Sequence, residues 1–248
     1  MNTVAEVIKR LEEIIDWAKD NNSQLGYFAA LYYKMTKAVD EGIRDGSFED
    51  GPRMARLDVV FARRYFDAFD AWQAGKKPTE AWVIAFEAAR EDQYTVLQHL
   101  LMGINAHINL DLGIAAAQTC PGNSIGQLET DFKRINDVIA SLVNKVQDSL
   151  SVICPPFWLF DWALKTEDEG IANFSIAVAR KAAWKTALRL APLADPASGP
   201  DVEQINQNIV RLGKLILHPG RLINFVLWLA RKTETGSVRQ KIDALMNI

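Results

Sequence analysis

Apolar residues recur every three or four positions along nearly the whole chain, which is the spacing of amphipathic helices. Residues 3–20 carry one such stripe, and another runs through Met54, Phe61, Tyr65 and Phe69. No stretch shows the strict alternation that is typical of a half-buried strand. The pattern predicts an all-α fold, a single-domain multi-helix bundle of about nine or ten helices.

Breaks rich in glycine and proline divide these helices. Pro52 follows a polar loop and is placed like a first-turn proline. Ser124 lies three residues before Gln127, a capping-box spacing that predicts a helix start there. A bulky segment, 157–164, leads into a predicted helix from about 168 to 190, and two helices are expected to close the chain, divided at 218–220.

The stretch at 191–200 is the best candidate for a domain boundary, because it holds three prolines and a glycine. Only residues 201–248 follow it, too few to favour an independent second domain. We therefore expect one α-helical domain over residues 1–248, with a weak boundary at 191–200.

The predicted helix at 95–118 is apolar enough for a central core helix but carries unusually many polar residues. They are Gln98, His99, Asn105, His107, Asn109 and Asp111, and they include two of the three histidines of the chain. A buried polar group without a partner costs about 1–3 kcal/mol. The cluster is therefore either a closed structural network or a functional site.

Helix geometry limits which of these residues can act together. Positions four apart differ by about 40° and about 6 Å, so His107 and Asp111 share a face. Gly103 lies one turn earlier on that face, where a glycine often permits close approach of another group. His99 lies about 12 Å from His107 along the axis and cannot share a mononuclear metal with it.

Three charged residues intrude on apolar stripes elsewhere. Asp58 is the polar member of the stripe from Met54 to Trp72 and needs a partner, for which Arg56, Arg63, Arg64, a histidine or a metal are candidates. Asp131 is a weaker case of the same kind. Arg180 lies between Ile176 and Trp184 and is a candidate for an internal counter-charge.

Composition and charge exclude several classes of function. The net charge of −3 gives no electrostatic reason to expect nucleic acid as a partner. No 18-residue apolar run predicts a membrane span, and the charged first twenty residues lack a secretory signal, so we expect a cytoplasmic protein. The two cysteines, Cys120 and Cys154, are expected to be reduced thiols. No phosphate-binding loop or dinucleotide fingerprint is present, so no nucleotide cofactor is expected.

The run LQHLLMGINAHINLDLGIAAA, with RMARLDVVFARRYFDAFDAW before it and LETDFKRINDVIASLVNKVQDSL after it, resembles a bacterial family of unknown function, domain of unknown function 5995. The resemblance covers roughly residues 25–195 and implies an α-helical cytosolic protein without a known activity. The residues that match the family pattern are Asp58, His99, Asn105, His107, Asn109, Asp111 and Asp131.

A more distant resemblance is to the helical zinc-dependent phospholipase C and single-strand nuclease group, which places His and Asp four apart on core helices. That group binds three metals with many histidines, and three histidines cannot supply such a site. One divalent metal held mostly by carboxylates remains an alternative.

Three functions compete. The first is a hydrolase-like enzyme in which His107 is a general base or metal ligand, Asp111 orients it or shares the metal, and Asp58 completes the site. His99 is a further catalytic candidate, and Asn105 and Asn109 are candidate substrate contacts. The second is a binding protein that uses the same pocket for a small amphipathic molecule. The third is a scaffold or homodimer that associates through the apolar run 225–230, in which the polar cluster is only structural.

Overall fold

The computed structural model describes residues 1–154 and 176–247, apart from the side chains at 139–141, 143–144, 176 and 177. This part of the chain contains eleven α-helices and no strand, which confirms the predicted all-α class. The predicted bulky segment at 157–164 and the predicted helix start near 168 lie outside the described residues.

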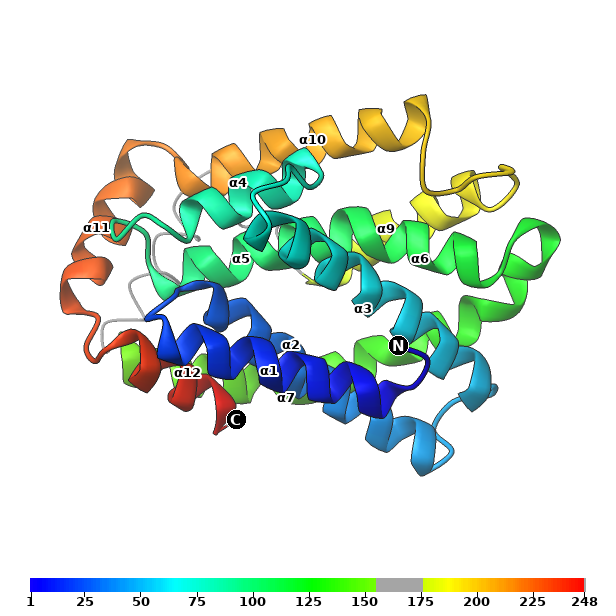
Figure 1. The fold of residues 1–248 in the computed structure, drawn as a ribbon, viewed down its shortest axis with the longest axis horizontal. Helices are drawn as coiled ribbons and strands as arrows, with labels where there is room; N and C mark the ends of the chain where they lie inside the picture. The colour runs from blue at the N-terminus through cyan, green and yellow to red at the C-terminus, as the bar shows by residue number, and fades with distance from the viewer. Residues whose placement is uncertain (155–175, 248) are drawn as a thin grey trace.

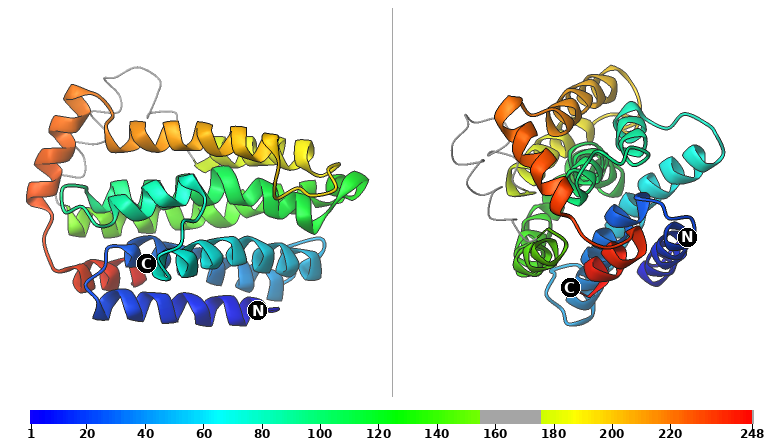
Figure 2. Two further views of the ribbon diagram at one scale, coloured as in Figure 1. Left: turned by 45° about the horizontal axis from the view of Figure 1, so that its top comes forward. Right: turned by 90° about the vertical axis from the view of Figure 1, so that its left-hand side faces the viewer.

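The α-helices follow one another as α1 (Val4–Asp20), α2 (Leu25–Arg44), α3 (Gly51–Gln73), α4 (Glu80–Ala88), α5 (Val96–Ala106), α6 (Leu112–Thr119), α7 (Glu129–Ile153), α9 (Ile176–Leu190), α10 (Pro200–Leu217), α11 (Arg221–Thr233) and α12 (Val238–Met246). A π-helical segment, η1 (His107–Asp111), joins α5 to α6, and a 3₁₀ segment, η2 (Gly122–Leu128), precedes α7. Most of the longer helices run side by side, and α11 crosses one end of the bundle (Figures 1 and 2).

Local capping explains where several helices begin. Asp50 accepts a hydrogen bond from the Arg53 N–H at the start of α3, and Pro52 occupies its first turn as predicted. Thr95 and Gln98 form a capping box at the start of α5. Each cap satisfies backbone N–H groups that have no partner inside the helix.

Two sequence predictions about the elements were wrong. Ser124 forms no capping box; its hydroxyl donates to the Pro121 carbonyl within η2, and α7 starts later, at Glu129. The described residues also hold more helices than the nine or ten expected. One reason is that η1 divides the helix at 95–118, and the other is that a capping box at Ser237 starts a third C-terminal helix, α12.

The continuous helix formed by α5, η1 and α6 packs against α2, α3, α4, α9 and α10. By length and composition alone Val96–Thr119 could cross a membrane, but 83% of its most apolar window is buried inside the bundle. Its position in the protein core accounts for its apolar character. Cys120 and Cys154, at the ends of α6 and α7, are both buried and unpaired.

Candidate functional site

The helix at Val96–Thr119 contains one π-helical turn, and this turn holds both His107 and Asp111. The Leu112 N–H donates to the His107 carbonyl, five residues earlier, whereas an α-helix spans four. Hydrophobic spacing does not reveal one inserted residue, so the sequence predicted an uninterrupted α-helix. Single π turns inside α-helices are frequent at functional sites.

Asp111 is held by donors from two neighbouring helices. Its Oδ1 accepts from Arg64 Nε of α3 at 2.8 Å, and its Oδ2 accepts from Trp82 Nε1 of α4 at 2.9 Å. Burial by itself would raise the pKa of this carboxyl, but Arg64, His107 and Trp82 together hold the pKa below its usual value. Asp111 is therefore a carboxylate fixed in both charge and orientation.

His107 presents one nitrogen to Asp111 and leaves the other free. Its Nδ1 lies 3.3 Å from Asp111 Oδ2. Because a carboxylate has no proton to donate, this pattern assigns the proton to Nδ1 and the lone pair to Nε2. Nε2 is buried and has no hydrogen-bond partner among the described residues. Burial lowers the pKa of His107 despite the opposing effect of Asp111, so the ring is neutral.

Two aromatic rings fix the plane of the His107 imidazole. Phe61 stacks on it with centroids 3.6 Å apart and planes at 8°. Tyr32 meets it edge-on, with centroids 4.5 Å apart. The direction of the Nε2 lone pair is therefore set by packing as well as by Asp111.

His107 lines a small, partly open cavity between side chains of α2, α3, α5, η1, α6, α7 and α9. The cavity volume is about 90 Å³. Most of its wall is apolar, with Leu31, Met35, Met54, Leu57 and Ile108 among the lining residues. Five side chains bring polar atoms to it: Tyr32, Thr36, Asp58, His107 and Arg180.

Asp58 reaches the cavity from α3 and is 8% exposed. Its Oδ2 has no hydrogen-bond partner among the described residues. Asp58 forms no ion pair with a described residue, and Arg64, one of its candidate partners, binds Asp111 instead. Burial, and secondarily the charge of Asp40, raise the pKa of Asp58 to about 7. Burial therefore favours the protonated form of this carboxyl below about pH 7.

Two hydroxyls of α2 add to the unpaired polar atoms of the cavity. Tyr32 Oη and Thr36 Oγ1 are buried and make no well-formed hydrogen bond within the described chain. Burial and Asp58 raise the pKa of Tyr32 well above its usual value, although the nearby Thr36 hydroxyl opposes this. Both hydroxyls are thus protonated and available to a ligand.

Arg180 enters the wall from α9 with only 3% of its surface exposed. Its Nε donates to Asn136 Oδ1 and its Nη2 to the Phe132 carbonyl, each at 2.5 Å. The sequence suggested an internal counter-charge. Both hydrogen-bond partners are neutral, however, and no carboxylate of the described residues pairs with it.

His99, a catalytic candidate from the sequence, does not line this cavity. His99 lines a different space of about 20 Å³, beside Gln24 and Gly103. Burial lowers its pKa to about 3, so the ring is neutral. Phe28 lies where a Cβ of Gly103 would be, which is the close approach expected at this glycine.

The other predicted site residues make structural contacts. Asn105 Nδ2 donates to the Ile209 carbonyl of α10, and Asn109 Nδ2 donates to Asn105 Oδ1. Neither asparagine lines the cavity, so we leave both out of the proposed site.

Asp131, a weaker candidate from the sequence, also makes contacts that hold two parts of the fold together. It accepts hydrogen bonds from the backbone N–H groups of Glu49 and Asp50 and from the Arg53 guanidinium. Burial opposes its ionisation, but these donors lower its pKa. Asp131 thus fastens the loop before α3 to α7.

The metal alternative gains no support from the geometry. Within residues 1–154 and 176–247, no group of three His, Cys, Asp or Glu side chains is arranged to bind a metal ion. Asp111, the expected second ligand, already has both carboxylate oxygens occupied by Arg64 and Trp82.

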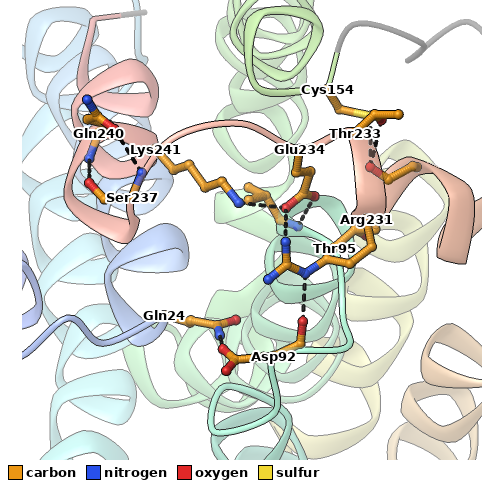
Figure 3. A network of polar contacts seen from close by, with 12 residues as sticks. Gln24, Asp92, Thr95, Cys154, Arg231, Thr233, Glu234, Ser237, Gln240 and Lys241 are labelled. Atoms are coloured by element: carbon orange, nitrogen blue, oxygen red, sulfur yellow. Dashed lines mark hydrogen bonds and ion pairs between the residues drawn. The ribbon is translucent and has the colours of Figure 1, made fainter.

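Sequence reasoning missed Trp82 and the pairing of Arg64 with Asp111, because both contacts join distant helices. It also missed a polar network around Glu234, between α11 and α12 (Figure 3). Glu234 accepts from the Val96 N–H at 2.7 Å and from Lys241 Nζ at 2.8 Å. The sequence signal for this network was the presence of two opposite charges, Glu234 and Lys241, near the end of the chain.

The described residues form a helical protein with a small, largely apolar cavity, which is lined by a histidine, His107, that Asp111 orients from behind. Residues 4–219 match the model of a family of unknown function, DUF5995, and the chain belongs to that family. The match extends beyond the range 25–195 that the sequence motifs suggested. No curated protein and no solved structure matches the chain.

Proposed function

We propose that this protein binds a small, mainly apolar molecule in the cavity, with His107 and Asp58 contacting the polar group of that molecule. The observation that carries the proposal is that His107 Nε2 and Asp58 Oδ2 both lie buried and without partners among the described residues, on the wall of one cavity. Each such atom costs about 1–3 kcal/mol when unsatisfied. A ligand with complementary groups would recover that free energy.

The two groups are complementary in their hydrogen-bonding roles. His107 Nε2 can only accept, because its proton is held on the Asp111 side. Asp58, with a pKa of about 7, can donate while it is protonated. A ligand hydroxyl, which can donate to Nε2 and accept from Asp58, fits such a pair, and the apolar walls fit a short hydrocarbon body.

Binding is tested with 1-butanol, a neutral probe with one hydroxyl and a short chain. The imidazole NMR signals of His107 should shift on titration, and the shift should saturate. His107→Phe keeps a ring that can stack on Phe61 but lacks Nε2, and it should weaken binding at least tenfold. His99→Phe changes the other buried histidine of the same helix and is the matched control. Ordered water alone in the cavity, with no saturable response to 1-butanol, would contradict the proposal.

A second candidate function, general acid–base catalysis, is favoured by the way Asp111 orients His107. In an enzyme of this kind His107 Nε2 would take a proton from a substrate or from an attacking water, as a hydrolase requires. Asp58 would donate a hydrogen bond to the oxygen on which negative charge develops.

Catalysis is tested with small substrates that suit the cavity. In D₂O, His107 would remove an α-proton of butanone, and deuterium would replace it after the enolate is reprotonated. NMR would follow this exchange and, in parallel, the hydrolysis of methyl acetate. General base catalysis typically contributes about 10²–10⁴-fold, so His107→Phe should remove nearly all of the rate. Rates equal in wild type and His107→Phe would reject the catalytic function without affecting the binding proposal.

Three further predictions are kept as proposals. A single domain is supported by one hydrophobic core that includes Val7 and Leu245, on opposite sides of the 191–200 boundary. A homodimer through α11 is supported by the exposure of Phe225 and Trp228, which are 59% and 55% accessible. A cytoplasmic location accords with two free thiols.

A further inference from the structure

Arg180 is a buried cation whose described partners are all neutral. Its guanidinium donates to Asn136 Oδ1 and to the Phe132 carbonyl, and it lies over the Phe132 ring, 4.6 Å from the centroid. Its Nη1 makes no hydrogen bond to the described residues. Burial lowers its pKa to about 10, so the group is still charged at neutral pH. Buried charges are normally paired, and this one lacks a counter-ion in the part of the chain described.

The described residues of the cavity wall do not supply that counter-ion. Asp58 is the carboxyl on the described wall, and its raised pKa of about 7 leaves it largely neutral below that pH. Asp111 is behind His107 and is occupied by Arg64 and Trp82. A negative charge brought by a ligand would meet Arg180 in a water-poor, apolar space, where charge-assisted hydrogen bonds are strong.

We infer that the cavity selects a short-chain aliphatic monocarboxylate, whose carboxylate binds Arg180 while its chain packs among the apolar wall residues. This inference rests on the proposed function and adds the class of ligand. The volume sets the length of the chain. At about 90 Å³ the cavity is smaller than the roughly 150 Å³ engineered site that binds benzene, so the hydrocarbon part of the ligand is smaller than benzene.

The geometry assigns different parts of such a ligand to different residues. The guanidinium of Arg180 is planar and can bind a carboxylate through two N–H groups. The single N–H of Nε and one N–H of Nη2 already have partners, so the carboxylate would use Nη1 and the second N–H of Nη2. His107 and Asp58, on η1 and α3, remain available to a second polar group on the chain, such as a hydroxyl or a carbonyl. A short hydroxy or keto acid would therefore use more of the site than butyrate does.

The test compares three probes of nearly equal shape, namely butyrate, butyramide and 1-butanol, at constant ionic strength and pH 6. We expect wild-type protein to bind butyrate at least tenfold more tightly than butyramide. Arg180→Met should abolish this preference, and Arg180→Lys should retain part of it. Arg189→Met, on an exposed part of the same helix, is the matched control and should behave as wild type.

A second variant covers the case in which Arg180→Met does not fold. Asn136→Asp places a carboxylate where the amide oxygen already accepts from Arg180 Nε, so it neutralises the cation without changing the shape of the site. It should weaken butyrate binding about tenfold and leave 1-butanol binding unchanged. Circular dichroism would verify that each variant is folded.

The outcomes separate this inference from the proposed function. If 1-butanol binds but butyrate shows no preference, or if butyrate binding survives in Asn136→Asp, the inference about Arg180 is wrong and the binding function stands. If none of the probes binds wild-type protein, both are wrong. A preference for butyrate that is lost in Arg180→Met and Asn136→Asp supports both.

Discussion

His107 Nδ1 lies 3.3 Å from Asp111 Oδ2 within a single π turn, and this contact decides which nitrogen of the imidazole carries the proton. The carboxylate is already fixed by Arg64 and Trp82, so the ring adapts to it rather than the reverse. The same arrangement in catalytic triads holds the imidazole in one tautomer and one orientation.

The first prediction concerns this tautomer. The chain has three histidines, so ¹⁵N-detected NMR of the imidazole groups can be assigned by substitution. We expect His107 to be neutral at pH 7 and in the Nδ1–H form, because burial lowers its pKa. Asp111→Asn should produce a mixture of tautomers, since an amide can both donate and accept. His99, in the same spectra, should not respond to this substitution, and an Nε2–H tautomer of His107 in wild type would contradict the assignment.

The second prediction concerns the dependence of stability on pH at Asp58. Because its pKa is about 7 when folded and near 3.8 when unfolded, the folded state binds the extra proton between these values. Its contribution to stability is full below pH 3.8 and is lost as the pH rises to 7. Asp58→Asn removes this dependence. Relative to wild type it should gain roughly 3 kcal/mol between pH 5 and pH 8, at about 1.4 kcal/mol per pH unit up to the folded pKa.

Urea denaturation at pH 5, 6, 7 and 8 measures this difference. Asp67→Asn, an exposed carboxylate of the same helix, is the control for the general loss of one negative charge. A difference between Asp58→Asn and wild type that is constant over this range would show that Asp58 is ionised in the folded protein.

The third prediction concerns the contact between Gly103 and Phe28. A Cβ at Gly103 would overlap the Phe28 ring, which is itself packed against Tyr65, Trp82 and His107. Overpacking of this kind costs about 1–3 kcal/mol, more than the roughly 1 kcal/mol that alanine gains over glycine in a helix. Gly103→Ala should therefore lower the free energy of unfolding.

A second substitution shows whether the clash is the cause. Gly103→Ala should cost less in a Phe28→Ala background than in wild type, because Phe28→Ala removes Cγ and Cδ2, the two atoms nearest to the added methyl group. Gly126→Ala is the control, since a Cβ there meets no atom within 4 Å. Equal stability of Gly103→Ala and wild type would mean that the Phe28 side chain shifts to accommodate the added methyl group without a net cost in the free energy of unfolding.

Local features of the chain were predictable, and long-range pairings were not. The helix class followed from periodicity, and the start of α3 followed from Pro52. The π turn left no trace in the hydrophobic spacing. The pairing of Arg64 with Asp111 depends on how α3 packs against η1, which no local pattern encodes. For Asp58 the sequence indicated burial, but protonation rather than pairing resolved its charge.

The last prediction concerns the ion pair between Glu234 and Lys241, whose side chains are only 3% and 6% exposed (Figure 3). Glu234 also accepts from the Val96 N–H at the start of α5, where the helix dipole favours a negative charge. The pair therefore fastens α12 and the end of α11 to the helix that carries the candidate site. Arg231 adds a second cation, 3.5 Å from Glu234 Oε2.

Removing one partner of this pair should cost more than removing both, because a single change leaves a buried charge unpaired. We expect Glu234→Gln, which leaves the Lys241 ammonium unpaired, to lower the free energy of unfolding by about 3–5 kcal/mol. Lys241→Met should cost less, because Arg231 and the Val96 N–H still bind the carboxylate. The double variant should be more stable than Glu234→Gln alone. Arg239→Gln is the control. Arg239 lies on the same helix as Lys241, and its exposed ion pair with Asp20 of α1 should contribute only about 0–1 kcal/mol to the free energy of unfolding. If the two single losses simply add in the double variant, the two side chains are not coupled, and the fastening of α12 must come from its apolar contacts with α2 and α7 instead.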